Sequence, residues 1–591
     1  MTDLLRQLLE MRQAVPLSWS PDGSRLLVAS NLPGTHQLYE WPSLRQLTSY
    51  DEPVTGQFLP DGRVLVEVDE GGNERTQLHV VGEGALVADA RFIHRSPHAR
   101  GRLLAYATNR RNGVDFDVVA RDLETGEEQV FELEGNNGVA AVSPDGRSIV
   151  VERVGARSGD NDLLLCDLGS GEVSLLTPHE EAAEFLSPVW TPEGWAWATN
   201  AGRDTFAVVR GGETLFESEW DVDLAGDESG RLLLALENAD GYARLHLVGG
   251  NAAGEAGVAP GPGVGGSAAD AASLGVPLPG RGVVEHPVFS PDGARLAFAF
   301  SSPVEPHDVY VYDLGSRRLE RLTTSPRAVE PSALVEPTLH RFESFDGESV
   351  PVFLFEPEGD GPFPVVVTVH GGPEAQWLPW FSPSFAPLTQ YLVSRGYAVA
   401  APNVRGSSGY GKRYEHLDDI ELRLDSVRDL ASLHAWLAAR PEIDGSRAAV
   451  YGRSYGGYMV LAALAFQPEL WAAGIEAVGI ASLVTFLENT SPYRRAARER
   501  EYGSLARDRE FLERASPLAH VDAIRAPLFI QHGRNDPRVP VTESEQIAAV
   551  LRENGVECEL LIFEDEGHTV EKLPNRIETF ERAVAFLERV L

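Results

Sequence analysis

The stretch RAAVYGRSYGGYMVLAALAFQ, residues 447–467, decides the fold of the C-terminal half of the chain. An apolar strand-like run leads into GRSYG, residues 452–456, and an apolar helix-like run follows. Glycines leave steric room for a sharp turn from strand to helix, and such a turn lifts a serine hydroxyl above the edge of a sheet. The pattern G-x-S-x-G is common by itself, but between a strand and a helix it predicts a nucleophile elbow with Ser454 as the nucleophile.

Around this motif, strand-like runs alternate with longer helical runs from residue 331 to the C-terminus. FPVVVTVH, YAVAAPNVRG, APLFIQHG and CELLIFED are strand-like, whereas DSVRDLASLHAWLAARP and NRIETFERAVAFLERVL have helical periodicity. Near-continuous apolar strands separated by amphipathic helices indicate a mostly parallel sheet that is covered by helices on both faces. We therefore expect an α/β-hydrolase domain over residues 331–591.

A serine nucleophile needs a base, and the chain supplies an acid and a histidine in the required order. Asp536 follows the strand-like run PLFIQHG, and His568 follows CELLIF, so both lie where parallel strands end. We expect Asp536 to fix the tautomer of His568, with Asp565 as the alternative acid. Because a free imidazole titrates near about 6.5, activity should fall as acid protonates His568.

The same edge of the sheet offers an oxyanion hole. His370-Gly371-Gly372-Pro373 ends the run VVVTVH and matches the HGG type of motif that supplies a backbone N–H. We expect Gly372 to provide one donor and Tyr455, directly after the nucleophile, to provide the other.

Four arginines stand close together between the nucleophile and Asp536. Arg494, Arg495, Arg498 and Arg500 lie in the segment SPYRRAAREREYG. One interpretation is a solvated helix face paired with neighbouring glutamates. The other is a substrate site in which Arg494 and Arg495 meet at the helix end made by Ser491-Pro492. They would then hold either a free C-terminal carboxylate or a backbone carbonyl of the substrate.

The first part of the chain repeats a turn. Pro-Asp-Gly closes at Gly23, Gly62, Gly146 and Gly293, weaker copies occur at Gly101, Gly194 and Gly230, and a short apolar strand follows each one. A spacing of about 40 residues with two hairpins per repeat is typical of a four-stranded propeller blade. We expect a seven-bladed β-propeller over residues 15–330, and a two-sheet sandwich is the competing interpretation. The Gly/Ala/Pro-rich stretch from Gly250 is expected to be a flexible insertion.

Composition narrows the class of protein. The 591 residues carry a formal net charge of −37, which opposes binding to nucleic acid and to anionic membranes. Two cysteines make no disulfide framework, although one bond stays open. Since residues 1–14 resemble an amphipathic helix more than a signal peptide, and no long apolar run or metal motif occurs, we expect a cytoplasmic enzyme without metal or cofactor.

The motifs together resemble the prolyl oligopeptidase family of serine peptidases, and within it the acylaminoacyl-peptidase-like branch. The resemblance rests on HGGP at 370–373, NVRGSSGYG at 403–411, GRSYGGYM from Gly452, NDPRVP from Asn535 and EGH from Glu566. Glu374 stands where related sequences often carry another polar residue. The resemblance implies a peptidase whose propeller restricts access, so that short peptides are cleaved and folded proteins are spared. It also implies an N-terminal helix packed on the hydrolase domain, and a homo-oligomer.

Three other functions use the same residues. A carboxypeptidase would recognise the free C-terminus through the arginines, and a carboxylesterase or lactone hydrolase would use the same triad. A propeller scaffold with a dead hydrolase domain belongs to a different class, and the intact Ser454, Asp536 and His568 argue against it.

Overall fold

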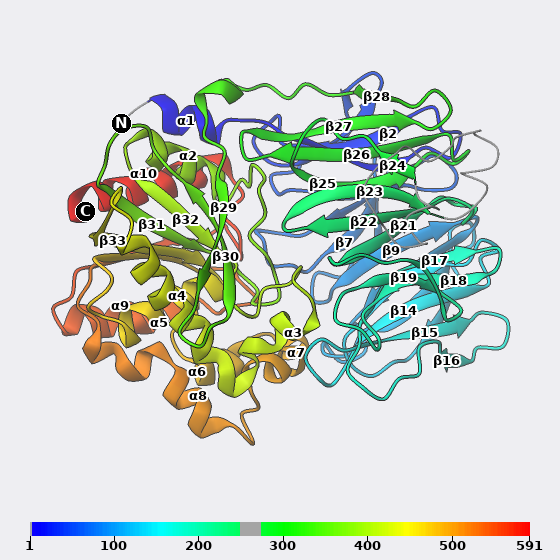
Figure 1. Ribbon diagram of the computed structural model, residues 1–591. Coiled ribbons are helices and arrows are strands. Elements are labelled where there is room, and N and C mark those ends of the chain that lie inside the picture. The colour runs from blue at the N-terminus through cyan, green and yellow to red at the C-terminus, as the bar shows by residue number, and fades with distance from the viewer. Residues whose placement is uncertain (1–2, 249–273) are drawn as a thin grey trace.

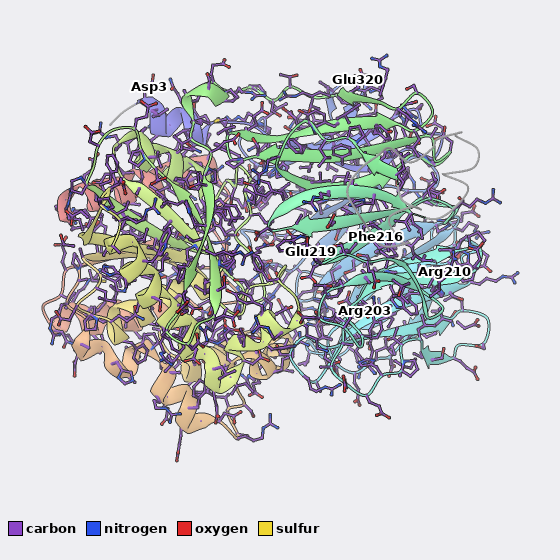
Figure 2. All side chains as sticks on the ribbon, in the orientation of Figure 1. Asp3, Arg203, Arg210, Phe216, Glu219 and Glu320 are labelled. Carbon is purple, nitrogen blue, oxygen red and sulfur yellow. The ribbon has the colours of Figure 1, made fainter. Side chains whose placement is uncertain are left out.

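The computed structural model describes residues 3–248 and 274–591, and within them the chain forms a propeller and an α/β domain that lie side by side (Figure 1). Seven four-stranded antiparallel sheets form the propeller in the described residues, which confirms the predicted fold. Long charged side chains such as Arg210 and Glu320 lie along its outer edge (Figure 2). The expected flexible insertion from Gly250 lies outside the described residues as far as residue 273.

Each blade consists of strands that are consecutive in the sequence. The blades are β1–β4 (Ala14–Trp19, Leu26–Ser30, Gln37–Trp41, Arg45–Gln46), β5–β8 (Thr55–Phe58, Val64–Val68, Gln77–Val80, Gly84–Val87), β9–β12 (His94–Arg100, Leu103–Thr108, Asp117–Asp122, Glu128–Phe131), β13–β16 (Asn137–Val142, Ser148–Val154, Asn161–Asp167, Val173–Leu175), β17–β20 (Phe185–Thr191, Gly194–Thr199, Ala207–Arg210, Glu213–Phe216), β21–β24 (Val222–Gly226, Leu233–Ala239, Tyr242–Val248, Leu274–Val276) and β25–β28 (Val283–Phe289, Arg295–Ser302, Glu305–Asp313, Arg318–Arg321).

The repeated turn has one hydrogen-bonding pattern. In the first blade Ser20 Oγ donates to Asp22 Oδ1 at 2.5 Å and accepts from the N–H of Arg25 at 2.9 Å, while Gly23 takes a φ of 68° that favours glycine. Ser143 with Asp145 and Ser290 with Asp292 repeat the bond at 2.7 and 2.6 Å. The side chains thus close the hairpins between the first two strands of these blades.

The first and seventh blades close the ring by side-chain packing, without a shared strand. Trp19 Nε1 donates to the carbonyl of Val288 at 3.2 Å, and the guanidinium of Arg295 lies 4.2 Å from the Trp19 ring centroid. Apolar side chains of both blades form one buried cluster there: Ala14, Leu26, Val28, Ala297, Val309 and Val311.

The α/β domain contains an eight-stranded sheet in the order β29-β30-β32-β31-β33-β34-β35-β36, parallel from β32 to β36. Neighbouring residues of one strand face opposite sides, so Val365 and Val367 enter one core and Val366 the other. The strands are β29 (Thr338–Glu343), β30 (Ser349–Phe355), β31 (Phe363–Val369), β32 (Ala398–Pro402), β33 (Ile443–Arg453), β34 (Ala473–Ala477), β35 (Leu528–Gly533) and β36 (Cys558–Phe563).

Helices cover both faces of this sheet, as predicted. Side chains of α4 (Arg423–Ala438), α5 (Tyr455–Phe466) and α9 (Thr542–Glu553) pack on one face. Those of α1 (Asp3–Leu9), α2 (Ala386–Ser394) and α10 (Leu573–Val590) pack on the other. The remaining α-helices of the described residues are α3 (Lys412–Glu415), α6 (Leu483–Asn489), α7 (Pro492–Tyr502) and α8 (Arg509–Ala515).

The N-terminal helix belongs structurally to the α/β domain. Leu5, Leu8 and Leu9 of α1 are buried against α2 and α10, although the next residues of the chain enter the first blade. The exact boundaries 1–14, 15–330 and 331–591 stay predictions. Cys166 and Cys558 are both free thiols. None of the described helices is long and apolar enough to cross a membrane.

Candidate active site

Ser454 occupies the turn between β33 and α5. Its backbone has φ 60° and ψ −119°, a conformation that costs energy for a residue with a Cβ. Close backbone contacts enforce the turn: a Cβ on Gly456 would lie 2.2 Å from the carbonyl oxygen of Val369, and one on Gly452 would lie 2.3 Å from that of Gly456. The glycines are therefore required for the elbow, and the strained serine is presented at the end of the strand.

Asp536 and His568 are hydrogen-bonded at the carboxyl ends of β35 and β36. His568 Nδ1 lies 2.6 Å from Asp536 Oδ2, and the other carboxylate oxygen accepts from the backbone N–H groups of Arg538 and Val539 at 2.8 and 3.1 Å. Both side chains are buried. The two backbone donors fix the carboxylate, and the carboxylate in turn fixes the imidazole.

Burial sets the charges of this pair. Burial would raise the pKa of Asp536, but the hydrogen bonds and charges of His568 and His532 outweigh it and hold that pKa well below its usual range. Burial lowers the pKa of His568 to about 4, against the pull of Asp536 and with help from Arg453 and Arg538. At neutral pH the carboxylate is therefore ionised and the imidazole is neutral, which is the state that a general base needs.

Arg453 ties the elbow to the histidine loop. Its Nη2 donates to the carbonyl oxygen of His568 at 2.8 Å and to the hydroxyl of Thr569. The residue before Ser454 thus holds the backbone of His568, so the two loops lie next to each other. The Ser454 hydroxyl makes no hydrogen bond with another described residue, and the serine–histidine contact of the predicted triad stays a prediction.

The predicted oxyanion donors stand on either side of the elbow. A Cβ on Gly371 would lie 3.5 Å from the Cβ of Ser454, which places the HGG loop against the nucleophile. Gly372 has φ 129° and no room for a side chain, since a Cβ there would lie 2.8 Å from the nitrogen of Glu374. Tyr455 is the first residue of α5, where backbone N–H groups lack partners inside the helix. These donor roles remain predictions.

The phenol of Tyr455 is anchored in a buried ionic network. Its hydroxyl lies 2.8 Å from Ser426 Oγ and 3.0 Å from Asp418 Oδ2. The fully buried guanidinium of Arg423 bonds both Asp418 and Glu501. Among the described residues, Asp418, Asp419 and Glu501 have the spacing of metal ligands, but Arg423 already supplies a cation to two of them.

The two arginines singled out in the sequence do not converge. Both lie on α7, and Pro492 begins that helix as expected. Arg494 Nη1 lies 3.6 Å from Glu74 of the propeller, whereas Arg495 Nη2 donates to the carbonyl of Glu488 at 2.6 Å. The structure therefore gives the two guanidinium groups different partners.

Arg538 is a residue that the sequence analysis missed. It stands two positions after Asp536, and its Nε donates to the Glu74 carboxylate that also faces Arg494. Its place in the motif NDPRVP, beside the acid, was the available signal. Arg494 and Arg538, from separate segments of the α/β domain, thus share one propeller carboxylate.

A propeller loop lies directly on the loops that carry Asp536 and His568. The carbonyl of Gly71 accepts from Asn535 Nδ2 at 2.9 Å. A Cβ on Gly567 would lie 1.9 Å from the carbonyl oxygen of Gly72, so the two backbones touch. No motif in residues 69–75 predicts this contact from the sequence.

Carboxylates gather at the domain interface beside the HGG loop. Glu374 accepts from Ser158 Oγ of the propeller at 3.3 Å, and burial, then the neighbouring Glu501, raise its pKa to about 7. Burial, then Glu184 and other acids, raise the pKa of Glu415 to about 9. This side of the site therefore has an excess of acids.

Known proteins share parts of this chain. Residues 383–591 match the prolyl oligopeptidase family. "Dipeptidyl peptidase family member 6" of Caenorhabditis elegans is 29% identical over 329 residues, 51% of this chain and 44% of that protein. "Dipeptidyl aminopeptidase BIII" of Pseudoxanthomonas mexicana is 32% identical over 291 residues, which are 47% of this chain and 42% of that protein. "Acylamino-acid-releasing enzyme 1" of Oryza sativa is 28% identical over 229 residues, which are 37% of this chain and 29% of that protein. The matches span less than half of each relative's length.

The fold comparison covers both domains. A solved structure of a prolyl endopeptidase superposes with a TM-score of 0.85 over 99% of this chain and 90% of that one, at 18% identity, which shows the shared fold. Both the propeller and the α/β domain therefore have counterparts in one known architecture. With the nucleophile elbow and the Asp536–His568 pair, the match identifies residues 383–591 as a serine-peptidase domain of the prolyl oligopeptidase family, in a chain whose fold is that of the solved prolyl endopeptidase.

Proposed function

We propose that this chain hydrolyses short peptides through an acyl-enzyme on Ser454. The observation that carries the proposal is the buried Asp536–His568 hydrogen bond held beside the elbow by Arg453. His568 takes the proton of Ser454, the serine oxygen attacks the scissile carbonyl, and the backbone N–H groups of Gly372 and Tyr455 bind the oxyanion. His568 then protonates the leaving amine, and water repeats the sequence to release the acid.

The domain arrangement supports peptides as the substrate class. The loop of residues 69–75 meets the loops of Asp536 and His568, so the propeller restricts approach to the catalytic pair from that side. A small ester needs no such restriction, which favours the peptidase over the carboxylesterase. The homo-oligomeric state, the cytoplasmic location and the absence of a cofactor stay predictions.

The end of the peptide that is recognised separates two candidate activities. The sequence resemblance favours an acylaminoacyl-peptidase-like exopeptidase, which removes a blocked N-terminal residue. The excess of carboxylates beside the HGG loop, Glu374, Glu184 and Glu415, favours a free α-ammonium group instead, because a cation would relieve their mutual repulsion. Dipeptidyl aminopeptidase, the name of one relative, describes that second activity.

The carboxypeptidase alternative loses support. Binding one substrate carboxylate with Arg494 and Arg495 requires that both guanidinium groups reach the same point. Arg494 faces Glu74 and Arg495 donates to the end of α6, so the pair would have to be rearranged.

One experiment tests the activity and the end preference together. A single hexapeptide is offered with a free or acetylated N-terminus and with a free or amidated C-terminus, to wild type and Ser454→Ala. We expect turnover and phosphonate labelling in wild type, both abolished in Ser454→Ala. Faster cleavage of the free-amine form supports the dipeptidyl activity, and faster cleavage of the acetylated form supports the acylaminoacyl activity. Labelling that persists in Ser454→Ala contradicts the nucleophile, and absence of turnover supports the scaffold.

A further inference from the structure

A partly enclosed cavity lies behind the nucleophile elbow, between the face of the sheet that α2 and α10 cover and the propeller residues 31–36. Its volume is about 220 Å³. Tyr451, Ile475 and Phe529 belong to the buried core of this face, and Arg453, Ala477 and Gln531 follow two residues later on the same strands. The lining contains neither Ser454 nor Asp536 nor His568, so the cavity is separate from the catalytic groups.

Two guanidinium groups face this cavity without an ion pair. Arg576 of α10 is 8% exposed and donates to the carbonyl of Pro383 at 3.0 Å. Arg453 lies deep in the protein but keeps some accessible surface, as expected for a side chain that borders a cavity. Among the described residues no carboxylate oxygen lies within 4 Å of either one. Burial lowers the pKa of both. Burying cations without an anion is costly.

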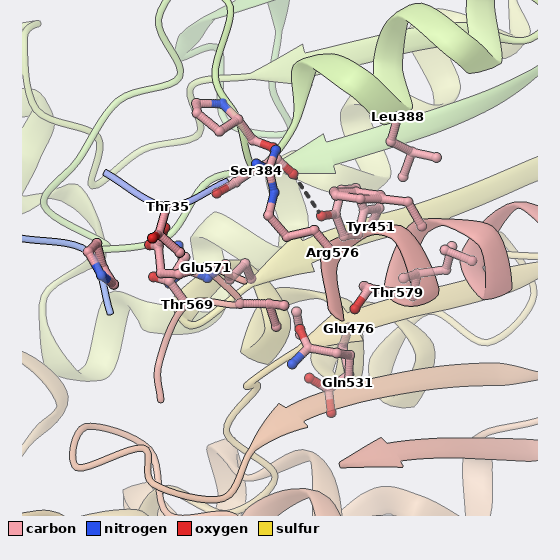
Figure 3. Close-up of a pocket in the computed structure, with 18 of the residues that line it drawn as sticks. Thr35, Ser384, Leu388, Tyr451, Glu476, Gln531, Thr569, Glu571, Arg576 and Thr579 are labelled. Atoms are coloured by element: carbon pink, nitrogen blue, oxygen red, sulfur yellow. Dashed lines mark hydrogen bonds between the residues drawn. The ribbon is translucent and has the colours of Figure 1, made fainter. Parts of the chain in front are cut away.

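A third donor in the cavity has no partner. Gln531 is 6% exposed, and its Nε2 makes no hydrogen bond with any described residue. Buried amide groups are nearly always paired. In Figure 3 Gln531 lies on the strand side of the pocket, Arg576 reaches in from α10, and Tyr451 donates to Ser384. An amide donor and two cations thus border the same space.

Two acids also border the cavity. Glu571 interacts with both arginines through its charge, but without contact. Glu476 accepts from the N–H of Gly479 at 2.7 Å, and burial raises its pKa to about 7. Among the described residues neither acid forms an ion pair with Arg453 or Arg576, so both guanidinium groups are left without an anionic partner in the cavity.

The apolar part of the lining is contributed by Leu388, Ile475, Phe529, Val570, Phe580 and Ala583. Polar residues of the propeller and of the α/β domain complete it: Asn31, Thr35, His36, Ser384, Thr569 and Thr579. A cavity of about 150 Å³ is enough for one benzene ring, so this one has room for a ring and a carboxylate. We propose that the cavity binds a small monocarboxylic acid with an apolar body, its carboxylate on Arg576, Arg453 and Gln531 and its body against Phe580. This is a second binding site, distinct from the site of hydrolysis.

The test is a calorimetric titration of the full chain carrying Ser454→Ala, with phenylacetate and phenylacetamide as probes. We expect phenylacetate to bind with one-to-one stoichiometry and the amide to bind at least about tenfold more weakly, since charge-assisted bonds to guanidinium are the stronger ones. Adding Arg576→Gln should weaken phenylacetate at least about tenfold, whereas Arg582→Gln on the exposed side of the same helix should change nothing. Equal affinity of acid and amide, or no binding up to about 10 mM, overturns the proposal.

Two further measurements show whether the loss of binding comes from a folding defect and whether the ligand binds in this cavity. Ala583→Leu keeps both arginines and fills the cavity, so it should abolish binding while far-UV circular dichroism stays unchanged. In crystals soaked with 4-bromophenylacetate, the anomalous signal of bromine should lie beside Phe580. Undiminished binding to Ala583→Leu, or a bromine signal only at the catalytic loops, contradicts the site.

Discussion

His568 and Asp536 are both removed from water, yet burial acts on them with opposite outcomes. The imidazole gains one charged hydrogen-bond partner, which does not compensate for burial, so its pKa falls to about 4. The carboxylate gains two backbone donors and two histidines, which do compensate. The pair is therefore held as anion and neutral base over the whole physiological range.

The first prediction concerns the pH dependence of hydrolysis. A histidine with a lowered pKa stays neutral until the pH approaches that value, so kcat/KM should hold from pH 8 to about pH 5.5 and fall tenfold per unit below about pH 4. The sequence alone places this fall near about 6.5. The profile is recorded on a neutral peptide, with circular dichroism at each pH to show that the chain is folded. A fall centred at 6.5 would mean that burial does not control His568.

The second prediction identifies the acid. Asp536→Asn should lower kcat by about 10³–10⁴ with little change in KM, because an amide cannot hold the required tautomer or stabilise the imidazolium. Asp565→Asn is the matched control: Asp565 is bonded to Lys572 at 2.8 Å, whereas the described acid bonded to His568 is Asp536, so the loss of Asp565 should cost less than about threefold. If Asp565→Asn were the inactive variant, the assignment of Asp536 would be wrong.

At the scale of elements, α7 gives Arg494 and Arg495 different partners. Adjacent residues of a helix point about 100° apart, so Arg494 and Arg495 separate once α7 forms. Tyr493 packs on Phe116 of the propeller at 5.6 Å between ring centroids, and Arg500 Nη1 donates to the carbonyls of Gly155, Arg157 and Asp160. Tyr493, Arg494 and Arg500 of α7 thus face the propeller. Glu501 does so too, since it accepts from Ser158 Oγ at 2.9 Å.

The third prediction follows from these contacts. Arg500→Met should lower the stability of the domain interface by about 2 kcal/mol, because a charged donor is lost and three carbonyls are left without it. The readout is the midpoint of thermal unfolding. Arg498→Met, on the same helix and without a hydrogen bond to a described residue, should leave the midpoint unchanged, because it should alter the free energy of unfolding by no more than about 0.5 kcal/mol. Equal midpoints for Arg500→Met and wild type would show that these bonds contribute nothing.

Local sequence was sufficient for the blades, the elbow and the alternation of strands and helices in the α/β domain. The number of Pro-Asp-Gly turns predicts the number of blades, because each turn is stabilised by hydrogen bonds among its own side chains, as between Ser20 and Asp22. The contacts of Glu74 with Arg494 and Arg538 join residues more than 400 positions apart, and no periodicity encodes such a pairing. Orphan donors such as Gln531 are likewise visible only after packing.

At the scale of the whole molecule, the propeller and the α/β domain share a surface at the catalytic loops. The fourth prediction is a limit on substrate size. A flexible peptide of about ten residues should be cleaved, while the same sequence in a surface loop of a folded protein should survive at least about a hundredfold longer, because the loop 69–75 restricts approach.

The measurement is mass spectrometry of both substrates at equal concentration. The control is the same host protein unfolded by reduction of its disulfides and offered as tryptic fragments, which should be cleaved. Rapid cleavage of the native loop would show that the propeller does not act as a filter.

The contact between the backbones of Gly72 and Gly567 constrains how this chain can evolve. A side chain at either position would displace the loop of His568, so neither glycine can change alone without loss of turnover. Substitutions on the two sides of this contact must therefore occur together, so the propeller and the hydrolase domain evolve as one unit. A chimera that joins this propeller to the α/β domain of a distant relative should inherit a misplaced histidine unless both loops are exchanged together.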